Sequence, residues 1–496
     1  MKKETIMQYT TPEKMGIRSE NILDFLKFIE ETHLPIHNVI IMRHGEIVFE
    51  NYWKPFHKDT LHRMYSVTKS FVSLAMGFLE QDGMIDLDAP ISKYFPEESK
   101  YADTEYMKKQ TIRQMLKMST AKPFIDWFTA RTDDRVRLYF QNDRTESRPA
   151  GTIFDYDSHG SFVMGSLIER ITGKELLTYL REKFLDRIGF SKEAYMLKCP
   201  GGHSWSDSAL VCKPSDLLKA SMFVMNGGVI DGEQVLNAEY IEKATGKQVE
   251  TQLAEWKYAD GFGYGYQFWR TLDNSYFMNG MGSQYAVNIP DKDMIFVING
   301  DTQGNASACD LIMSNFFNMI VRKAADESLP EDADAQKALA DYADSLSLFA
   351  VKGAKTSPWA ERINGKEFEM NKNPMGISKL RIELAENSGK LFYTNEQGDK
   401  EITFGLSENA FCDFPQDGYS GLVGSEKGDS RYPCAASAYW FENQLMIKVQ
   451  IIGEYLGNLN ITIGFTPDDE VGVFMIKSAE DFLNEYQGFA GGKMIK

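Results

Sequence analysis

Hydrophobic residues in the first 325 positions follow a strand period at both ends and a helical period between them. Two apolar runs, 39–42 and 47–49, flank a His-Gly turn dipeptide, and this arrangement predicts a β-hairpin. Apolar positions then recur at helical spacing over 67–81 and 160–172. A glycine follows each of these runs where a left-handed C-terminal cap is expected. The chain therefore starts with a hairpin and continues with amphipathic helices.

Three further strands are predicted later in this region, at 276–278, 284–289 and 294–298. A helix is predicted from about Asn305 to about Lys323, because asparagine is a good N-cap. Strands at both ends of a region with helices between them indicate an α+β domain whose terminal strands share one antiparallel sheet.

A change of period marks a second domain. Residues 326–335 are acidic and polar, as is typical of a linker, and a short helix is predicted to follow as far as Leu348. From about residue 360 the period becomes two, as over 459–465, and about six to eight short strands indicate a closed barrel or a sandwich. The predicted division is a domain at 1–325, a linker with a short helix at 326–350, and an all-β domain at 351–496.

Composition narrows the possible partners. The 496 residues include 54 Lys+Arg and 71 Asp+Glu, which give a net charge of −17. This acidic balance argues against nucleic acid and against anionic membranes as partners, because both require a basic surface. The hydrophobic share of 43% and the charged share of 25% are those of a globular protein. The first residues hold no apolar run of signal-peptide length, and no run is long enough to span a membrane, so we expect a cytoplasmic protein.

Cysteines and histidines predict neither a disulfide framework nor a metal centre. The five cysteines are widely spaced and odd in number. The seven histidines all precede residue 204 and form no HxH or HExxH pair. We therefore expect no metal and no cofactor.

The segment Ser66-Val67-Thr68-Lys69 is the strongest candidate for chemistry. Residues three apart on a helix share a face, so the lysine amine can reach the serine hydroxyl. A neighbouring base makes serine a nucleophile, and lysine can be that base where apolar surroundings disfavour its charged form. The free N–H groups at a helix N-terminus could also stabilise an oxyanion. The structural alternative is that Ser66 is an N-cap and that the stem of Lys69 packs along the helix.

Other serine motifs are weaker. A second S-x-x-K match runs from Ser119 to Lys122, but Pro123 follows at once, so no helix is expected to continue there. The chain contains no G-x-S-x-G sequence, which argues against an α/β-hydrolase.

Two later segments could complete a site. Tyr156 and Ser158 are two residues apart in a predicted loop and so face one side, where the phenol could relay a proton to or from a lysine. The alternative is an aromatic anchor followed by a capping serine. At 277–284, Asn279 and Gly280 lie at a predicted strand end where glycines let a ligand or another backbone approach. A bulged hairpin is the alternative there.

In their order and spacing these segments resemble the serine β-lactamase and penicillin-binding-protein superfamily, over roughly residues 10–325. The likeness is closer to class C β-lactamases and to related esterases, D-aminopeptidases and 6-aminohexanoate-dimer hydrolases. Flanking sequence agrees at 65–71, 86–90 and 165–173. The resemblance implies a β-lactamase-like α+β domain, an antiparallel five-stranded sheet with helices on both sides, followed by a lipocalin-like β-barrel.

The resemblance also implies an acyl-enzyme mechanism. Ser66 would attack a carbonyl, and Lys69 and Tyr156 would share the roles of general base and acid. The backbone N–H groups of Ser66 and Met281 would form the oxyanion hole. Water, or another amine or alcohol, would release the acyl group. The expected substrate contacts are Ser158, Asn279, Gly280 and Gln284.

Two departures from the family pattern concern the substrate. Ser158 stands where the family usually has the asparagine of Tyr-x-Asn. Met278-Asn279-Gly280 stands where a lysine or histidine usually begins the third motif and helps bind a substrate carboxylate; the 6-aminohexanoate-dimer hydrolases also lack that cation. The change favours a small ester or amide as the substrate. Two alternatives remain: a penicillin-recognising β-lactamase or D-amino-acid peptidase, and a catalytically weak member that binds a ligand or partner.

The sequence does not decide the role of some features. Trp127, Phe128 and Trp205 fit either a pocket lining or the core of the helical region. The barrel could be a lid over the site, an oligomer contact or a small-molecule binder.

Overall fold

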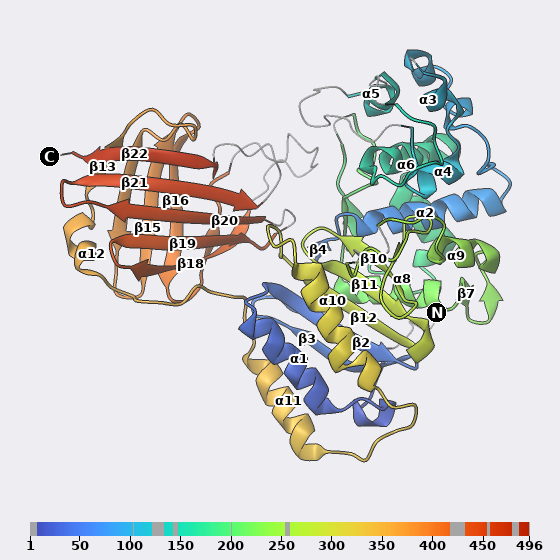
Figure 1. The fold of residues 1–496 in the computed structure, drawn as a ribbon, viewed down its shortest axis with the longest axis horizontal. Helices are drawn as coiled ribbons and strands as arrows, with labels where there is room; N and C mark the ends of the chain where they lie inside the picture. The colour runs from blue at the N-terminus through green and yellow to red at the C-terminus, as the bar shows by residue number, and fades with distance from the viewer. Residues whose placement is uncertain are drawn as a thin grey trace. The chain divides into compact units, whose positions relative to one another are not determined.

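The structure is a computed structural model. It describes residues 7–102, 104–121, 133–141, 147–199, 201–252, 258–416, 432–453, 457–478 and 486–495. The described residues up to Ser347 form one compact unit, and those from Leu348 onward form a second (Figure 1).

A seven-stranded sheet lies at the centre of the first unit. Its strands, in spatial order, are β1 (Gln8–Tyr9), β3 (Glu46–Tyr52), β2 (Ile36–Arg43), β12 (Met294–Gly300), β11 (Gln284–Ile289), β10 (Tyr276–Gly280) and β9 (Trp269–Arg270). The predicted hairpin and the three predicted late strands are present, and β12 pairs antiparallel with β2, so both ends of the region share one sheet. The expected number of five strands is wrong, because β1 and β9 extend the two edges. Strands of two residues are too short to carry a periodic signal.

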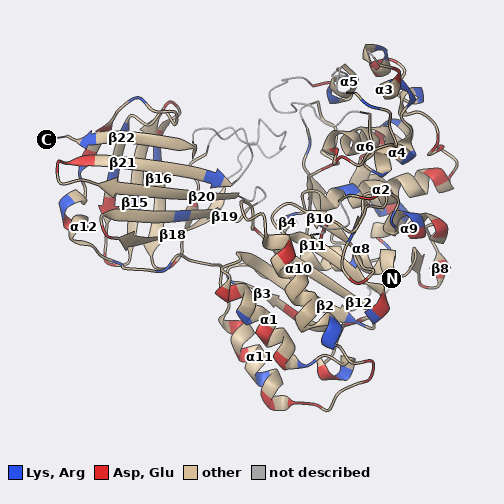
Figure 2. Cartoon of the chain, viewed as in Figure 1, with Lys and Arg blue, Asp and Glu red and all other residues tan. Residues whose placement is uncertain are grey.

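Helices cover both faces of this sheet. On one face α1 (Ser19–Glu31) and α10 (Ala308–Met319) share a core with strand residues such as Phe296. On the other face α8 (Pro214–Met225) contacts β11 and β12, and α2 (Val67–Gln81) contacts β10. Being buried on both faces, the central strands are almost free of charged residues (Figure 2).

The remaining helices of the first unit lie mostly on the α8 side. They are α3 (Glu105–Lys109), α4 (Ile112–Leu116), α5 (Arg135–Gln141), α6 (Ser158–Thr172), α7 (Leu176–Leu180) and α9 (Ala238–Thr245). The helices predicted at 67–81 and 160–172 are therefore present as α2 and α6, and Gly173 caps α6 with a φ of 68°.

A further helix, α11 (Ala333–Ser345), packs against α1. Leu339, Ala343 and Leu346 are buried in the core that α1 and α10 share. Residues 326–347 were expected to be a linker with a short helix, but they belong to the first unit. The acidic residues from Asp326 to Asp332 precede α11 and are exposed, as in a linker. The linker interpretation missed the apolar face of the helix that follows them, which carries Leu339 and Ala343.

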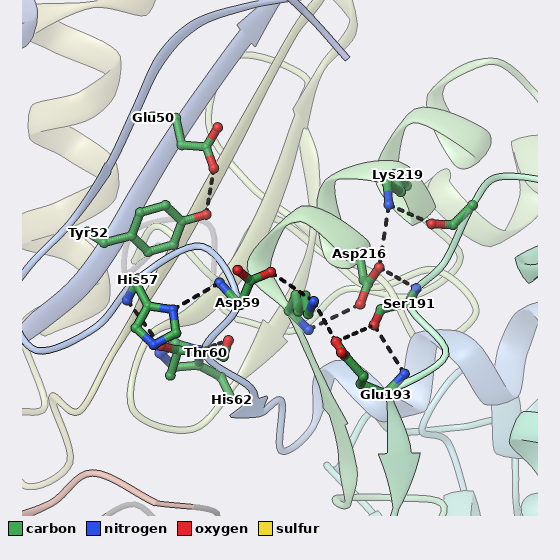
Figure 3. Close-up of polar contacts among 12 residues, drawn as sticks. Glu50, Tyr52, His57, Asp59, Thr60, His62, Ser191, Glu193, Asp216 and Lys219 are labelled. Carbon is green, nitrogen blue, oxygen red and sulfur yellow. Dashed lines mark hydrogen bonds and ion pairs between the residues drawn. The ribbon is translucent and has the colours of Figure 1, made fainter. Parts of the chain in front are cut away.

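Ion pairs anchor the segment that joins β3 to α2 (Figure 3). Lys213 Nζ, directly before α8, lies 2.9 Å from the Asp59 carboxylate and 2.5 Å from that of Glu193. The chain then forms β4 (His62–Arg63), which pairs antiparallel with β6 (Leu210–Cys212). The start of α2 is thereby tied to the helical part of the unit.

The second unit is a β-barrel, so the barrel is the correct one of the two all-β alternatives. The strands that the structure describes are β13 (Glu367–Met370), β14 (Lys379–Leu384), β15 (Ser388–Asn395), β16 (Gly398–Leu406), β17 (Ala410–Asp413), β18 (Pro433–Phe441), β19 (Gln444–Ile451), β20 (Gly457–Phe465), β21 (Glu470–Ser478) and β22 (Gly488–Met494). A parallel pairing of β16 with β18 closes the barrel, and β17 pairs with β18. A short helix, α12 (Pro358–Ile363), precedes the first strand.

Candidate active site

Ser66 lies at the N-terminus of α2. Tyr65, directly before it, has a φ of 45°, a left-handed conformation that is uncommon for a bulky residue and that occurs often at functional sites. Every residue of α2 from Val67 to Leu79 is buried, so the helix is a rigid support. The half-buried Ser66 side chain makes no capping hydrogen bond to the helix. The alternative of a simple N-cap serine therefore does not describe this residue.

Lys69 lies one turn along α2, with its side chain almost completely buried (1% exposed). Its Nζ donates a hydrogen bond to Ser66 Oγ at 2.9 Å, and a second to the backbone carbonyl of Asp207 at 2.7 Å. The Asp207 carboxyl is itself buried, which raises its pKa. The amine is thus fixed against the serine hydroxyl, in the position that a general base requires.

The loop that carries Asp207 is attached to the start of α2 by further bonds. Arg63 Nε donates to the Ser208 carbonyl at 3.0 Å, and Thr68 Oγ1 accepts from the Leu210 N–H at 3.0 Å. On its other side the loop packs against Gly165 of α6, where a Cβ would lie 1.8 Å from the Ser206 hydroxyl. Only glycine allows this approach.

Tyr156 lies beside the Ser66–Lys69 pair. The Lys69 Nζ is 5.1 Å from the centroid of the Tyr156 ring, within the range of a cation–π contact. Trp269 of β9 stacks on Tyr156 at 5.6 Å between ring centroids, and Phe154 and Tyr264 contact the same indole. Sequence reasoning did not find Trp269. The aromatic residues of 264–269 were the available signal, but only folding brings them next to Tyr156.

Ser158 is the first residue of α6 and is half-buried. The cap of this helix is Asp157, whose side chain accepts from the Gly160 N–H at 3.0 Å. Complete burial raises the pKa of Asp157 to about 6. Lys69 makes its second hydrogen bond to the Asp207 carbonyl, and Ser158 forms none with it in the described part of the chain. The alternative that Ser158 caps the helix is wrong, since Asp157 does so.

The turn between β10 and β11 holds Met281. Gly280, the last residue of β10, packs against the backbone at Met64, which brings this turn next to the start of α2. Met281 is exposed. Within the described residues, the N–H groups of Ser66 and Met281 have no hydrogen-bond partner. Two free donors on adjoining segments are what an oxyanion hole requires.

Gln284 lies behind this turn and does not face a substrate. Its side chain is completely buried, and its Nε2 donates to the Gly300 carbonyl at 2.6 Å and to the carbonyls of Met281 and Gly282 at 3.3 Å. Asn299 Nδ2 donates to Gln284 Oε1 at 2.8 Å. Gln284 was expected to contact the substrate, and this expectation is corrected. Its buried amide instead holds the turn through hydrogen bonds to the backbone carbonyls of the turn.

The remaining candidate residues from the sequence lie in different surroundings. Met278 is buried and Asn279 is half-buried on β10. Ser119 is buried outside any helix, as Pro123 predicted, and Trp205 is buried beneath the Arg63 guanidinium. Lys122, Trp127 and Phe128 lie outside the described residues.

The described ranges hold no cluster of three or more His, Cys, Asp or Glu side chains placed to bind a metal ion. None of their helices combines the length and the apolar character needed to cross a bilayer.

The chain is similar to several known proteins. A family model described as Beta-lactamase matches residues 25–313. The 6-aminohexanoate-dimer hydrolase of Paenarthrobacter ureafaciens is 22% identical over 49% of this chain and 66% of its own length. Esterase EstB of Burkholderia gladioli is 39% identical over a shorter stretch, 12% of this chain and 17% of its own.

A solved structure shares the fold. It carries the 6-aminohexanoate-dimer hydrolase name, comes from Bacillus anthracis, and superposes with a TM-score of 0.52 at 18% identity, covering 66% of this chain and 89% of its own. The family model matches more than half of the chain, in the region that contains the Ser66–Lys69 pair. The chain belongs to the beta-lactamase family.

Proposed function

We propose that this protein is a serine hydrolase that forms an acyl-enzyme on Ser66 and acts on small esters or amides. The observation that supports this most directly is the 2.9 Å hydrogen bond from the buried Lys69 amine to Ser66 Oγ at a helix N-terminus. Serine is a poor nucleophile unless a base takes its proton, and here a candidate base is already in contact.

The reaction would proceed in two steps. Ser66 Oγ attacks the substrate carbonyl and loses its proton to the Lys69–Tyr156 pair, which returns a proton to the leaving alcohol or amine. The carbonyl oxygen becomes negatively charged and accepts hydrogen bonds from the N–H groups of Ser66 and Met281. Water, activated by the same pair, then attacks the ester on Ser66 and releases the acid.

Two features favour a neutral acyl group without a carboxylate. Met278 occupies the position at which related enzymes carry a cation for the substrate carboxylate, and it is buried. The aromatic residues Tyr156, Phe154 and Trp269 form an apolar surface beside the nucleophile. The names of two curated relatives, a 6-aminohexanoate-dimer hydrolase and an esterase, support hydrolysis as the reaction.

The direct test is turnover of a short-chain nitrophenyl ester by the full chain and by Ser66→Ala, with intact mass measured on the same samples. We expect the variant to lose about 10⁶-fold in rate, because nucleophile and base act as a unit. The matched control is Ser119→Ala, the serine of the second S-x-x-K match, which should retain turnover. Equal turnover by the wild type and Ser66→Ala would refute the proposal.

A substrate panel separates the remaining alternatives. The panel holds nitrophenyl esters, a nitroanilide, the linear dimer of 6-aminohexanoate and a chromogenic cephalosporin. We expect the neutral ester to be cleaved fastest. Faster opening of the cephalosporin would instead assign a β-lactamase, and acylation without release would point to a binding or acyl-transfer role.

A further inference from the structure

The barrel carries a pair of facing cysteines. Cys412 of β17 and Cys434 of β18 are direct register partners in an antiparallel pair. Their sulfur atoms are 3.3 Å apart, in contact as free thiols. The sequence spacing of 22 residues gave no hint of this, because the strand register alone makes the two residues neighbours.

The backbone geometry at this pair suits a covalent bond. The Phe414 N–H donates to the Tyr432 carbonyl at 2.8 Å, so that pair is hydrogen-bonded. Pairs alternate along an antiparallel ladder, and Cys412–Cys434, two positions on, is therefore also of the hydrogen-bonded type. Such pairs have Cα atoms about 5.5 Å apart, near the commonest Cα separation of disulfides.

We propose that Cys412 and Cys434 are a modification site at which a low-molecular-weight disulfide, such as glutathione disulfide, oxidises the thiol pair to a reversible cross-strand disulfide. The inference is independent of the proposed hydrolase activity. It rests on the register, on the sulfur contact, and on the access that the half-buried Cys412 gives to solvent.

The surroundings assign different roles to the two sulfurs. A hydrogen bond from the Cys434 thiol lowers the pKa of Cys412 to about 7, and the buried Cys434 has a raised pKa. Asp413 and Glu401 oppose the shift at Cys412 through their negative charge. The thiolate is the nucleophile in disulfide exchange, so Cys412 is the attacking sulfur.

The thiol–disulfide exchange takes place in two steps. The Cys412 thiolate attacks one sulfur of the small disulfide, forms a mixed disulfide and expels one thiolate. Cys434 loses its proton and attacks Cys412 Sγ, which forms the Cys412–Cys434 bond and expels the second thiolate. The two protein thiols lose two protons and two electrons, and the small disulfide becomes two thiols.

The bond would hold β17 on the barrel. Among the described strands, β17 forms ladder hydrogen bonds with β18 alone, over four residue pairs. A covalent link there closes a ring through residues 413–433 and restricts the unfolded chain, which stabilises the folded barrel. Reduction would release the link.

The test is a thiol count on the full chain after incubation with glutathione disulfide, made under denaturing conditions with a chromogenic disulfide reagent. We expect the wild type to fall from five thiols to three and to lose about 2 Da in intact mass, with a peptide joining Cys412 to Cys434. The thermal midpoint of the barrel should rise on oxidation and return with dithiothreitol.

Matched variants test whether the two lost thiols are those of Cys412 and Cys434. Cys412→Ser and Cys412→Ala should keep all four remaining thiols, whereas Cys309→Ser, which removes another half-buried cysteine, should still lose two. The proposal is overturned if the wild type keeps five thiols, if it stops at a mixed disulfide on Cys412, or if the linked peptide joins other cysteines or two chains.

Discussion

Gly280 packs so closely on Met64 that a Cβ at this glycine would lie 2.3 Å from the Met64 carbonyl oxygen. Met64 is two residues before Ser66, and Gly280 is directly before Met281. The contact therefore determines the spacing between the two backbone N–H groups proposed as the oxyanion hole. Because the neighbouring atom belongs to the backbone, no side-chain movement can relieve the steric clash that a larger residue at position 280 would make.

Replacing Gly280 by Ala should separate these two segments. We expect kcat for a nitrophenyl ester to fall by about 10²-fold or more with little change in KM, since the loss concerns the charged transition state. Gly472→Ala, on a barrel strand where a Cβ meets open space, is the control. A Gly280→Ala enzyme with wild-type kcat would show that the turn is not part of the oxyanion hole.

Lys69→Met keeps a similar volume and removes the amine that contacts Ser66 Oγ. We expect acylation to slow by about 10³-fold, the usual contribution of a general base. Acylation is followed by intact mass at early times after mixing with the ester. Lys243→Met, at an exposed lysine paired with Glu239, should acylate at the normal rate. Unchanged acylation of Lys69→Met would assign the base role elsewhere.

Gln284→Leu removes the amide that holds the carbonyls of the Met281 turn. We expect kcat to fall by about 10-fold or more, because the Met281 N–H is no longer positioned. The buried Asn288 of β11, whose Nδ2 donates to the Ser221 carbonyl of α8, provides the comparison. Asn288→Leu should lose a comparable amount of stability and retain kcat. An equal loss of kcat in both variants would show that general destabilisation, and not the position of the Met281 N–H, causes the loss.

His62, on β4 just before the site, should make the fold sensitive to acid. Burial lowers its pKa to about 4, and no described residue forms a hydrogen bond with its Nε2. The unfolded chain takes up a proton below about pH 6.5 and the folded chain does not until about pH 4. The stability present above pH 6.5 is therefore lost as the pH falls, by about 3 kcal/mol between pH 7 and pH 4.

The measurement is urea unfolding at pH 7 and pH 4 for the wild type and His62→Phe. We expect the free energy of unfolding of the variant to fall less than that of the wild type, by about the 3 kcal/mol assigned to His62. His57→Phe, at an exposed histidine, should behave as the wild type does. Parallel falls in the wild type and His62→Phe would contradict the assignment.

Much of this protein followed from sequence because the signals are local. The hairpin β2–β3, the helices α2 and α6, and the alternation of β20 each depend on a hydrophobic period and a turn or cap residue within a short window. The S-x-x-K pair is equally local: on any helix, Lys69 comes within reach of Ser66. The family resemblance rested on the same short segments.

Only the tertiary structure decided which distant segments meet. The assignment of α11 to the first unit, the Asp207 carbonyl at Lys69, the Trp269 indole on Tyr156 and the buried position of Gln284 all depend on contacts between residues far apart in the chain. No residue type or spacing encodes these pairings by itself. They follow from how the sheet, its helices and close glycine contacts such as Gly280–Met64 pack together.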